Sequence, residues 1–102
     1  MQSEVISEIQ IIPTKPQNGL LGFASFVLYQ SIYCSSVAIF SRPNGDYRLV
    51  YPTKKLENKE LNIFYPINKT IGELIEKVII SKFEEVMNND RHARFDYNAK
   101  GF

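Results

Sequence analysis

Two apolar runs that flank Pro43-Asn44-Gly45 constrain the fold more than any other feature of this sequence. Asn-Gly between such runs is a strong signal for a β-hairpin. Proline lacks the backbone N–H that a two-residue Asn-Gly loop would need at position 43. We therefore predict a type I turn, with Pro43 at its second position and Gly45 left-handed in a bulge.

The register that follows from this turn decides which side chains share a face. Arg42 falls opposite Asp46, which predicts a charge pair at the mouth of the hairpin. Apolar pairs are predicted for Ile39 with Leu49 and for Val37 with Tyr51. A slip of one residue would break both sets, so we expect a well-defined register.

The remaining periodicity predicts an α+β fold: a small antiparallel β-sheet of four to five strands, followed by one long C-terminal helix packed on one face. The expected strands span residues 6–12, 20–29, 32–41, 47–51 and 61–65. Residues 13–19 contain prolines, Asn and Gly, so we interpret them as the first turn or loop. Residues 53–60 are expected to form a charged loop.

A helix is predicted over residues 70–88. Thr70-Ile71-Gly72-Glu73 has the form of a capping box, with Thr70 as N-cap. Apolar side chains then recur on one helical stripe, which we interpret as the core face: Ile71, Leu74, Ile75, Val78, Phe83, Val86 and Met87. Asn88-Asn89 is expected to end the helix, so residues 1–89 form one domain and residues 90–102 a tail, either frayed or docked on a partner.

Length and composition are those of one globular domain. The chain has 102 residues, of which 44% are hydrophobic and 13% aromatic, and its formal charge is +1. No apolar run approaches the roughly 20 residues of a membrane span, and no secretory signal is recognised at the N-terminus. The single cysteine cannot form an internal disulfide, which fits a reducing compartment. We expect a cytoplasmic protein without a membrane partner.

The expected strand at residues 20–29 is apolar on both faces. Phe23, Val27 and Tyr29 fall on one face, and Ala24, Phe26 and Leu28 fall on the other. One helix covers only one face of a sheet, so the second face needs another cover. We predict that a second copy supplies it and that the chain is a homodimer.

No catalytic constellation is recognised, so we expect no enzyme, no cofactor and no metal. The only histidine, His92, lies in the tail without a group to orient it. Cys34 is interpreted as a small buried residue, and one Cys with one His cannot build a zinc site. Glu84 and Glu85 lie about 100° apart on the helix and do not face each other. No phosphate-binding glycine motif occurs.

Basic residues supply the candidate binding site. Lys54 and Lys55 lie together at a strand end, with Lys59 nearby, Arg48 on the adjacent strand and Lys69 just before the helix. We interpret these five residues as phosphate contacts for nucleic acid. The alternative is a solvated lysine loop that keeps a sheet edge soluble.

Several segments, taken in order, resemble the stage V sporulation protein G (septation protein SpoVG) family. Residues 22–27, Gly-Phe-Ala-Ser-Phe-Val, are similar to the family's Ala-x-Ala-Ser-Val-Thr strand, and Asn44-Gly45 precedes a short apolar strand. Residues 51–55, Tyr-Pro-Thr-Lys-Lys, are similar to Met-Pro-Ser-Lys-Arg. Residues 65–68, Tyr-Pro-Ile-Asn, are similar to His-Pro-Ile-Asn. The resemblance covers about residues 6–86.

The resemblance implies a homodimeric bacterial cytoplasmic regulator that binds DNA and, in some members, RNA. Lys54 and Lys55 match the basic pair that follows the family's proline. Gln10 and Ala38 stand where members tend to carry basic residues, and Leu61-Asn62 replaces an Arg-Asp step. Fewer basic groups predict weaker binding, because affinity follows the number of phosphates neutralised.

Two functions therefore remain open. The first is a dimeric regulatory protein that binds DNA or RNA through the basic loop of both subunits. The second is a dimeric protein-interaction module without nucleic-acid affinity, of mobile-element or phage origin. It would present the aromatic edge of Tyr47, Tyr51 and Tyr65, or the tail. Steep salt dependence is expected for the first and salt-tolerant binding for the second.

Overall fold

The computed structural model describes residues 5–99, and the side chains of residues 5–88. Four antiparallel strands form a sheet in sequence order: β1 (Ile6–Gln17), β2 (Leu20–Leu28), β3 (Ile32–Ser41) and β4 (Tyr47–Val50). A separate two-stranded sheet is formed by β5 (Thr53–Leu56) and β6 (Lys59–Asn62), and α1 (Lys69–Ala99) follows. The predicted α+β class, with a single long helix after the strands, is confirmed.

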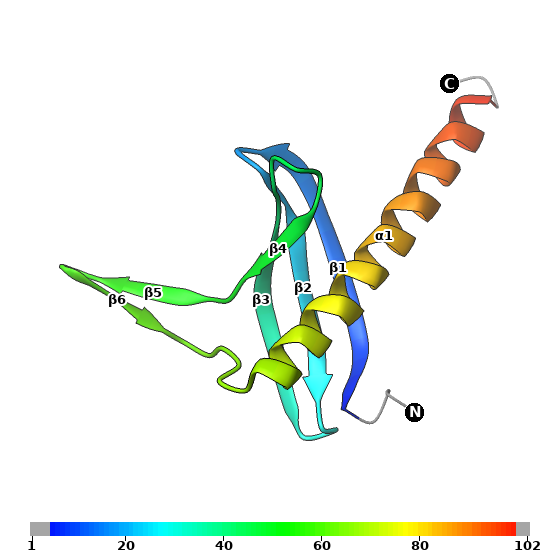
Figure 1. Ribbon diagram of the computed structural model, residues 1–102. Helices are drawn as coiled ribbons and strands as arrows, with labels where there is room; N and C mark the ends of the chain where they lie inside the picture. The colour runs from blue at the N-terminus through cyan, green and yellow to red at the C-terminus, as the bar shows by residue number, and fades with distance from the viewer. Residues whose placement is uncertain (1–4, 100–102) are drawn as a thin grey trace.

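The helix α1 lies across one face of the four-stranded sheet (Figure 1). Buried side chains from the two layers form the core: Ala24, Phe26, Val37 and Ile39 from the sheet, and Ile75, Ile79 and Phe83 from the helix. Phe26, Val37, Ile39 and Ile79 are fully buried. Each such large apolar side chain contributes about 1.5–3 kcal/mol by burial. Of these core residues, Ile79 was missing from the predicted stripe.

The turn between β3 and β4 has the predicted form. The Gly45 N–H donates to the Arg42 carbonyl at 3.0 Å, and the Arg42 N–H donates to the Asp46 carbonyl at 2.7 Å. Gly45 has a φ of 93°, which is the left-handed conformation expected of the bulge. Ile39 pairs with Leu49, so the predicted register is confirmed there.

The side chains at this turn differ from the prediction. Arg42 forms no ion pair with Asp46; its Nε donates to the Tyr47 carbonyl at 3.4 Å. The Asp46 carboxylate instead accepts from Asn44 Nδ2 at 3.5 Å, because the tight turn brings the asparagine amide closer. The strand β4 ends at Val50, so the predicted pairing of Tyr51 in the ladder is also wrong.

The first strand is longer than the predicted 6–12. It continues through Pro13, which pairs with Gly22, to Gln17. Prolines are tolerated because β1 is an edge strand, where a missing N–H removes no ladder bond. The predicted loop at 13–19 shrinks to Asn18-Gly19, whose φ values of 55° and 90° fit a two-residue type I′ hairpin turn.

The helix begins and ends at different residues from those predicted. Asn68, and not Thr70, is the N-cap, because its Oδ1 accepts from the Ile71 N–H at 2.9 Å. At the other end α1 continues to Ala99, past the expected stop at residues 88–89. Asparagine is only a mild helix breaker, so residues 88–89 do not by themselves end a helix. The side chains of the proposed tail, including His92, lie outside the described residues.

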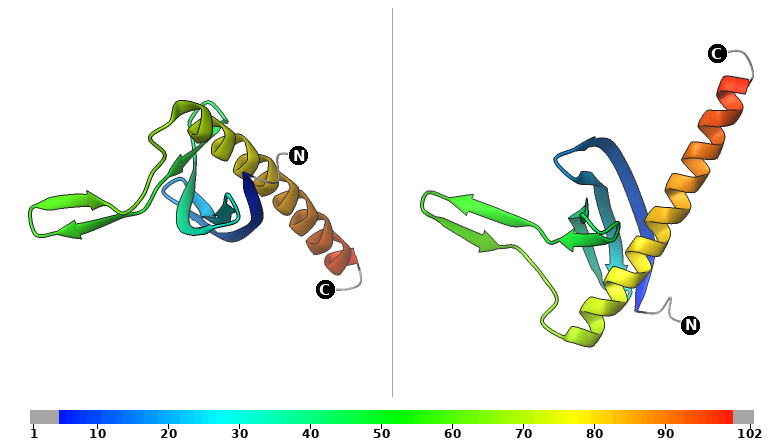
Figure 2. Two further views of the ribbon diagram at one scale, coloured as in Figure 1. Left: turned by 90° about the horizontal axis from the view of Figure 1, so that it is seen from below. Right: turned by 45° about the horizontal axis from the view of Figure 1, so that its top comes forward.

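The predicted charged loop at 53–60 and the predicted strand at 61–65 are replaced by a hairpin. Thr53 pairs with Asn62 and Leu56 with Lys59, around a two-residue loop. We call residues 53–62 the hairpin arm; every one of its side chains is exposed. It projects away from the sheet and the helix (Figure 1 and Figure 2). The turn residues are Glu57 and Asn58, and Glu57 has a φ of 47°, which non-glycine residues seldom adopt, so the local sequence carries no strong signal for this hairpin.

Candidate functional site

The hairpin arm distributes its lysines over two faces. Opposite residues of an antiparallel pair share a face, and so do residues two positions apart. Because Lys54 lies opposite Leu61 and Lys59 lies opposite Leu56, these four side chains share one face. Lys54 and Lys59 are therefore the cations that the structure brings together.

The second face of the arm is electrically balanced. Lys55 lies directly opposite Glu60, whose Oε2 accepts a hydrogen bond from Thr53 Oγ1 at 2.8 Å. Opposite charges paired across strands attract each other, which reduces what Lys55 offers to an external anion. Lys54 and Lys55, grouped in the sequence prediction, thus point to opposite faces.

Lys69 is the first residue of α1 and lies outside the arm. Its Nζ is 4.0 Å from Glu73 Oε2, and both side chains are largely exposed. Exposed ion pairs of this kind contribute only about 0–1 kcal/mol, since water screens them. The pair therefore leaves Lys69 able to exchange its carboxylate partner for a phosphate.

Arg48 lies on β4, and the fold brings two residues to it that the predicted site lacked. Phe40 pairs with Arg48 across the β3–β4 ladder, and Arg48 Cζ is 5.6 Å from the centre of the Phe40 ring. A guanidinium over an aromatic face at this distance is a cation–π contact. Arg42 lies at the start of the β3–β4 turn. The predicted hairpin register already placed Phe40 opposite Arg48, so the sequence contained the signal for this pair.

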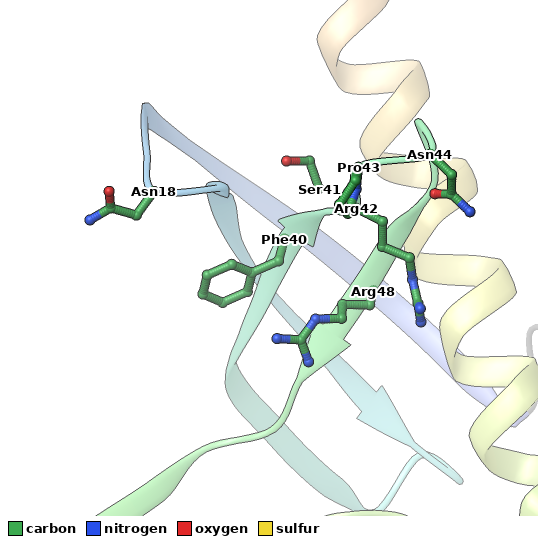
Figure 3. Close-up of a pocket in the computed structure, with 7 residues that line it drawn as sticks. All are labelled: Asn18, Phe40, Ser41, Arg42, Pro43, Asn44 and Arg48. Carbon is green, nitrogen blue, oxygen red and sulfur yellow. The ribbon is translucent and has the colours of Figure 1, made fainter.

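These residues border a hollow at one end of the sheet, which we call the arginine hollow. It has a volume of about 600 Å³ and is lined by Asn18, Phe40, Ser41, Arg42, Pro43, Asn44 and Arg48 (Figure 3). Within the described part of the chain, no carboxylate lies within 4.0 Å of either arginine. Glu76 lines a smaller hollow of about 260 Å³ that both arginines also border. The arginine hollow is thus suited to an anion.

Apolar surface remains uncovered on the rest of the molecule. The sheet face away from α1 exposes 62% of Ile12 and 67% of Tyr33, which border a hollow of about 340 Å³. An apolar groove of about 240 Å³ lies between the ends of β2 and β3, residues 64–66 and the start of α1. Cys34 lines this groove, and burial raises the pKa of its thiol, so the thiol is not activated as a nucleophile.

Tyr51 also borders the apolar groove. Burial, with the neighbouring Glu76 carboxylate as a further cause, raises the pKa of the Tyr51 phenol to about 12. Its ring packs edge-on against Phe64, with ring centres 5.8 Å apart. Tyr51 is therefore a neutral packing residue at physiological pH. Among the residues whose side chains are described, no three His, Cys, Asp or Glu groups converge as metal ligands.

In the described residues, no helix has both the length and the apolar character to cross a bilayer. No protein-family model matches the chain. A search of curated proteins finds no match either.

Proposed function

We propose that this chain is a homodimeric, cytoplasmic regulatory protein of the SpoVG type that binds DNA or RNA through its hairpin arm. The observation that carries the proposal is the projecting arm with Lys54 and Lys59 on one fully exposed face. A two-stranded β-ribbon has dimensions that fit the major groove of duplex DNA. Lysines on such a ribbon would neutralise phosphates and release counterions.

The uncovered apolar surface supports the homodimer. Ile12 and Tyr33 leave an apolar patch on the open sheet face, and a second copy that covers it would leave the Lys54 and Lys59 face of the arm free. A symmetric dimer would also present two arms and so double the number of phosphates contacted.

A second candidate function, a protein-interaction module without nucleic-acid affinity, is favoured by residues 63–67. Ile63, Tyr65 and Ile67 are all exposed along this segment, and Ile67 is 90% exposed. Alternating apolar side chains on an extended segment suit a protein partner, because their burial would not depend on salt.

Fluorescence anisotropy over a salt series distinguishes the two. Labelled duplex DNA and single-stranded RNA are titrated with the wild type, with Lys54→Gln/Lys59→Gln, and with Lys77→Gln/Lys82→Gln as a control of equal charge change on α1. We expect the arm variant to lose affinity and salt slope and the helix control to retain both. Failure of the wild type to bind either probe at low salt would refute the proposal, and a monodisperse monomer at micromolar concentration would refute the dimer.

A further inference from the structure

The arginine hollow contains a flat platform that the hairpin arm does not account for. Phe40 is half-buried on β3 and lines the hollow, and Arg48 extends over its ring from β4 (Figure 3). Arg48 Cζ is 5.6 Å from the ring centre, so the guanidinium and the ring are in cation–π contact. Both groups are planar surfaces on which nucleobases stack.

A second guanidinium borders the same hollow on the side that faces α1 (Figure 3). Arg42 borders the hollow from the β3–β4 turn, where its Nε donates to the Tyr47 carbonyl at 3.4 Å. This hydrogen bond orients the group and leaves its terminal N–H groups for an external acceptor. Guanidinium N–H groups in this planar arrangement match the oxygens of a phosphate.

The opposite wall of the hollow carries a polar group of another kind. Asn18, in the β1–β2 turn, borders the hollow at this side, and its amide points away from Phe40 and Arg48 (Figure 3). The volume of about 600 Å³ lies within the range of small-ligand sites. The ring and the guanidinium groups together match the base face and the phosphate of one nucleotide.

We propose that the arginine hollow binds an unpaired base of single-stranded nucleic acid, stacked on Phe40 and Arg48, with a flanking phosphate on Arg42. The inference rests on the proposed nucleic-acid-binding function and adds a subsite and a preferred substrate class to it. Bases within a duplex are stacked on both sides, so only an unpaired base can present its face to this platform. DNA and RNA share that chemistry.

The chain has no tryptophan, so Phe40→Trp places a single fluorescent indole in the platform. We expect short oligothymidine and oligouridine to quench its emission, because a stacked base contacts the indole directly. A duplex of the same length should bind through the arm without quenching. Binding of the single strands with unchanged emission would overturn the proposal.

Affinity measurements on the same probes provide the second test. Phe40→Leu should weaken single-strand binding about 5- to 100-fold and leave both the salt slope and duplex affinity unchanged. Arg42→Gln should lower the single-strand salt slope by about 0.7 for each occupied hollow, whereas Lys77→Gln, the matched charge change on α1, should not. Circular dichroism melts check that each variant folds. If Phe40→Leu does not fold, the quenching of Phe40→Trp and the salt slope of Arg42→Gln test the base site instead.

The outcomes separate this proposal from the one on which it rests. Wild-type affinity in Phe40→Leu, with binding lost in Lys54→Gln/Lys59→Gln, would overturn the base site and leave the arm as the nucleic-acid contact. Absence of wild-type binding to duplex and single strand alike would overturn both. Equal preference for oligothymidine and oligouridine is the expected result, since the platform contacts the base and not the sugar 2′ position.

Discussion

The start of α1 offers a sharp test of the fold, because two residues with capping side chains lie two positions apart. Asn68 Oδ1 accepts from the Ile71 N–H at 2.9 Å, and the Asn68 carbonyl accepts from the Gly72 N–H at 2.9 Å. Thr70 is an exposed residue in the first turn of the helix. We predict that Asn68→Ala lowers the free energy of unfolding by about 0.5–2 kcal/mol.

The matched variant is Thr70→Ala, for which we expect no loss of stability. Alanine has a higher helix propensity than threonine, so a gain of a few tenths of a kcal/mol is expected. Asn68→Asp should retain the wild-type stability, since aspartate caps as well and suits the helix dipole. The assay is urea unfolding followed by circular dichroism, at one protein concentration because a dimer's stability depends on it.

The loss in Asn68→Ala corresponds to a decrease in melting temperature of about 4–8 °C for each kcal/mol in a domain of this size. A larger loss in Thr70→Ala than in Asn68→Ala would refute the cap assignment. It would place the helix start two residues later, as the capping-box pattern predicted.

Three further predictions concern the core, the alkaline limit and the arm. Ile79→Ala should destabilise the fold by about 2–5 kcal/mol in urea unfolding, because Ile79 is fully buried between helix and sheet; a loss below 1 kcal/mol would contradict that packing. The raised pKa of Tyr51, about 12 against an ordinary 10.0, means that the unfolded chain releases this proton first. Stability should therefore be retained below about pH 10 and fall toward pH 12. The urea midpoint is measured at pH 10 and at pH 12, and it should decrease less between these two values in Tyr51→Phe than in the wild type. Lys54→Gln should lower the salt slope of duplex binding by about 0.9 for each bound arm, and Lys55→Gln, opposite Glu60, by less; equal effects in anisotropy titrations would mean that the two faces of the arm act alike.

Local chemistry explains why some elements could be predicted and others could not. Pro43 and Gly45 restrict their own backbone so strongly that the turn, and with it the Ile39–Leu49 register, follows from a few neighbouring residues. The length of β1 depends on its place at the edge of the sheet, where Pro13 removes no ladder bond. Position in a sheet is a tertiary property, so the sequence of residues 13–17 alone suggests a loop.

The candidate site shows the same division. The lysines were identifiable by type, but their faces depend on the pairing of β5 with β6, which the prediction of a loop excluded. Phe40 and Arg48 could be paired from the predicted hairpin register. Asn18 joins them only because the β1–β2 turn reaches the same end of the sheet as the β3–β4 turn, and no local pattern indicates that.

The hairpin arm also affects how this protein can evolve. All of its side chains are exposed, and the buried core lies entirely in β1, β2, β3 and α1. Exposed substitutions of this kind usually change stability by no more than about 0.5 kcal/mol. Mutations in residues 53–62 are therefore expected to have little effect on folding. Ten consecutive positions can diverge rapidly while the sheet and helix are preserved, so related proteins could share this body and differ in their arms.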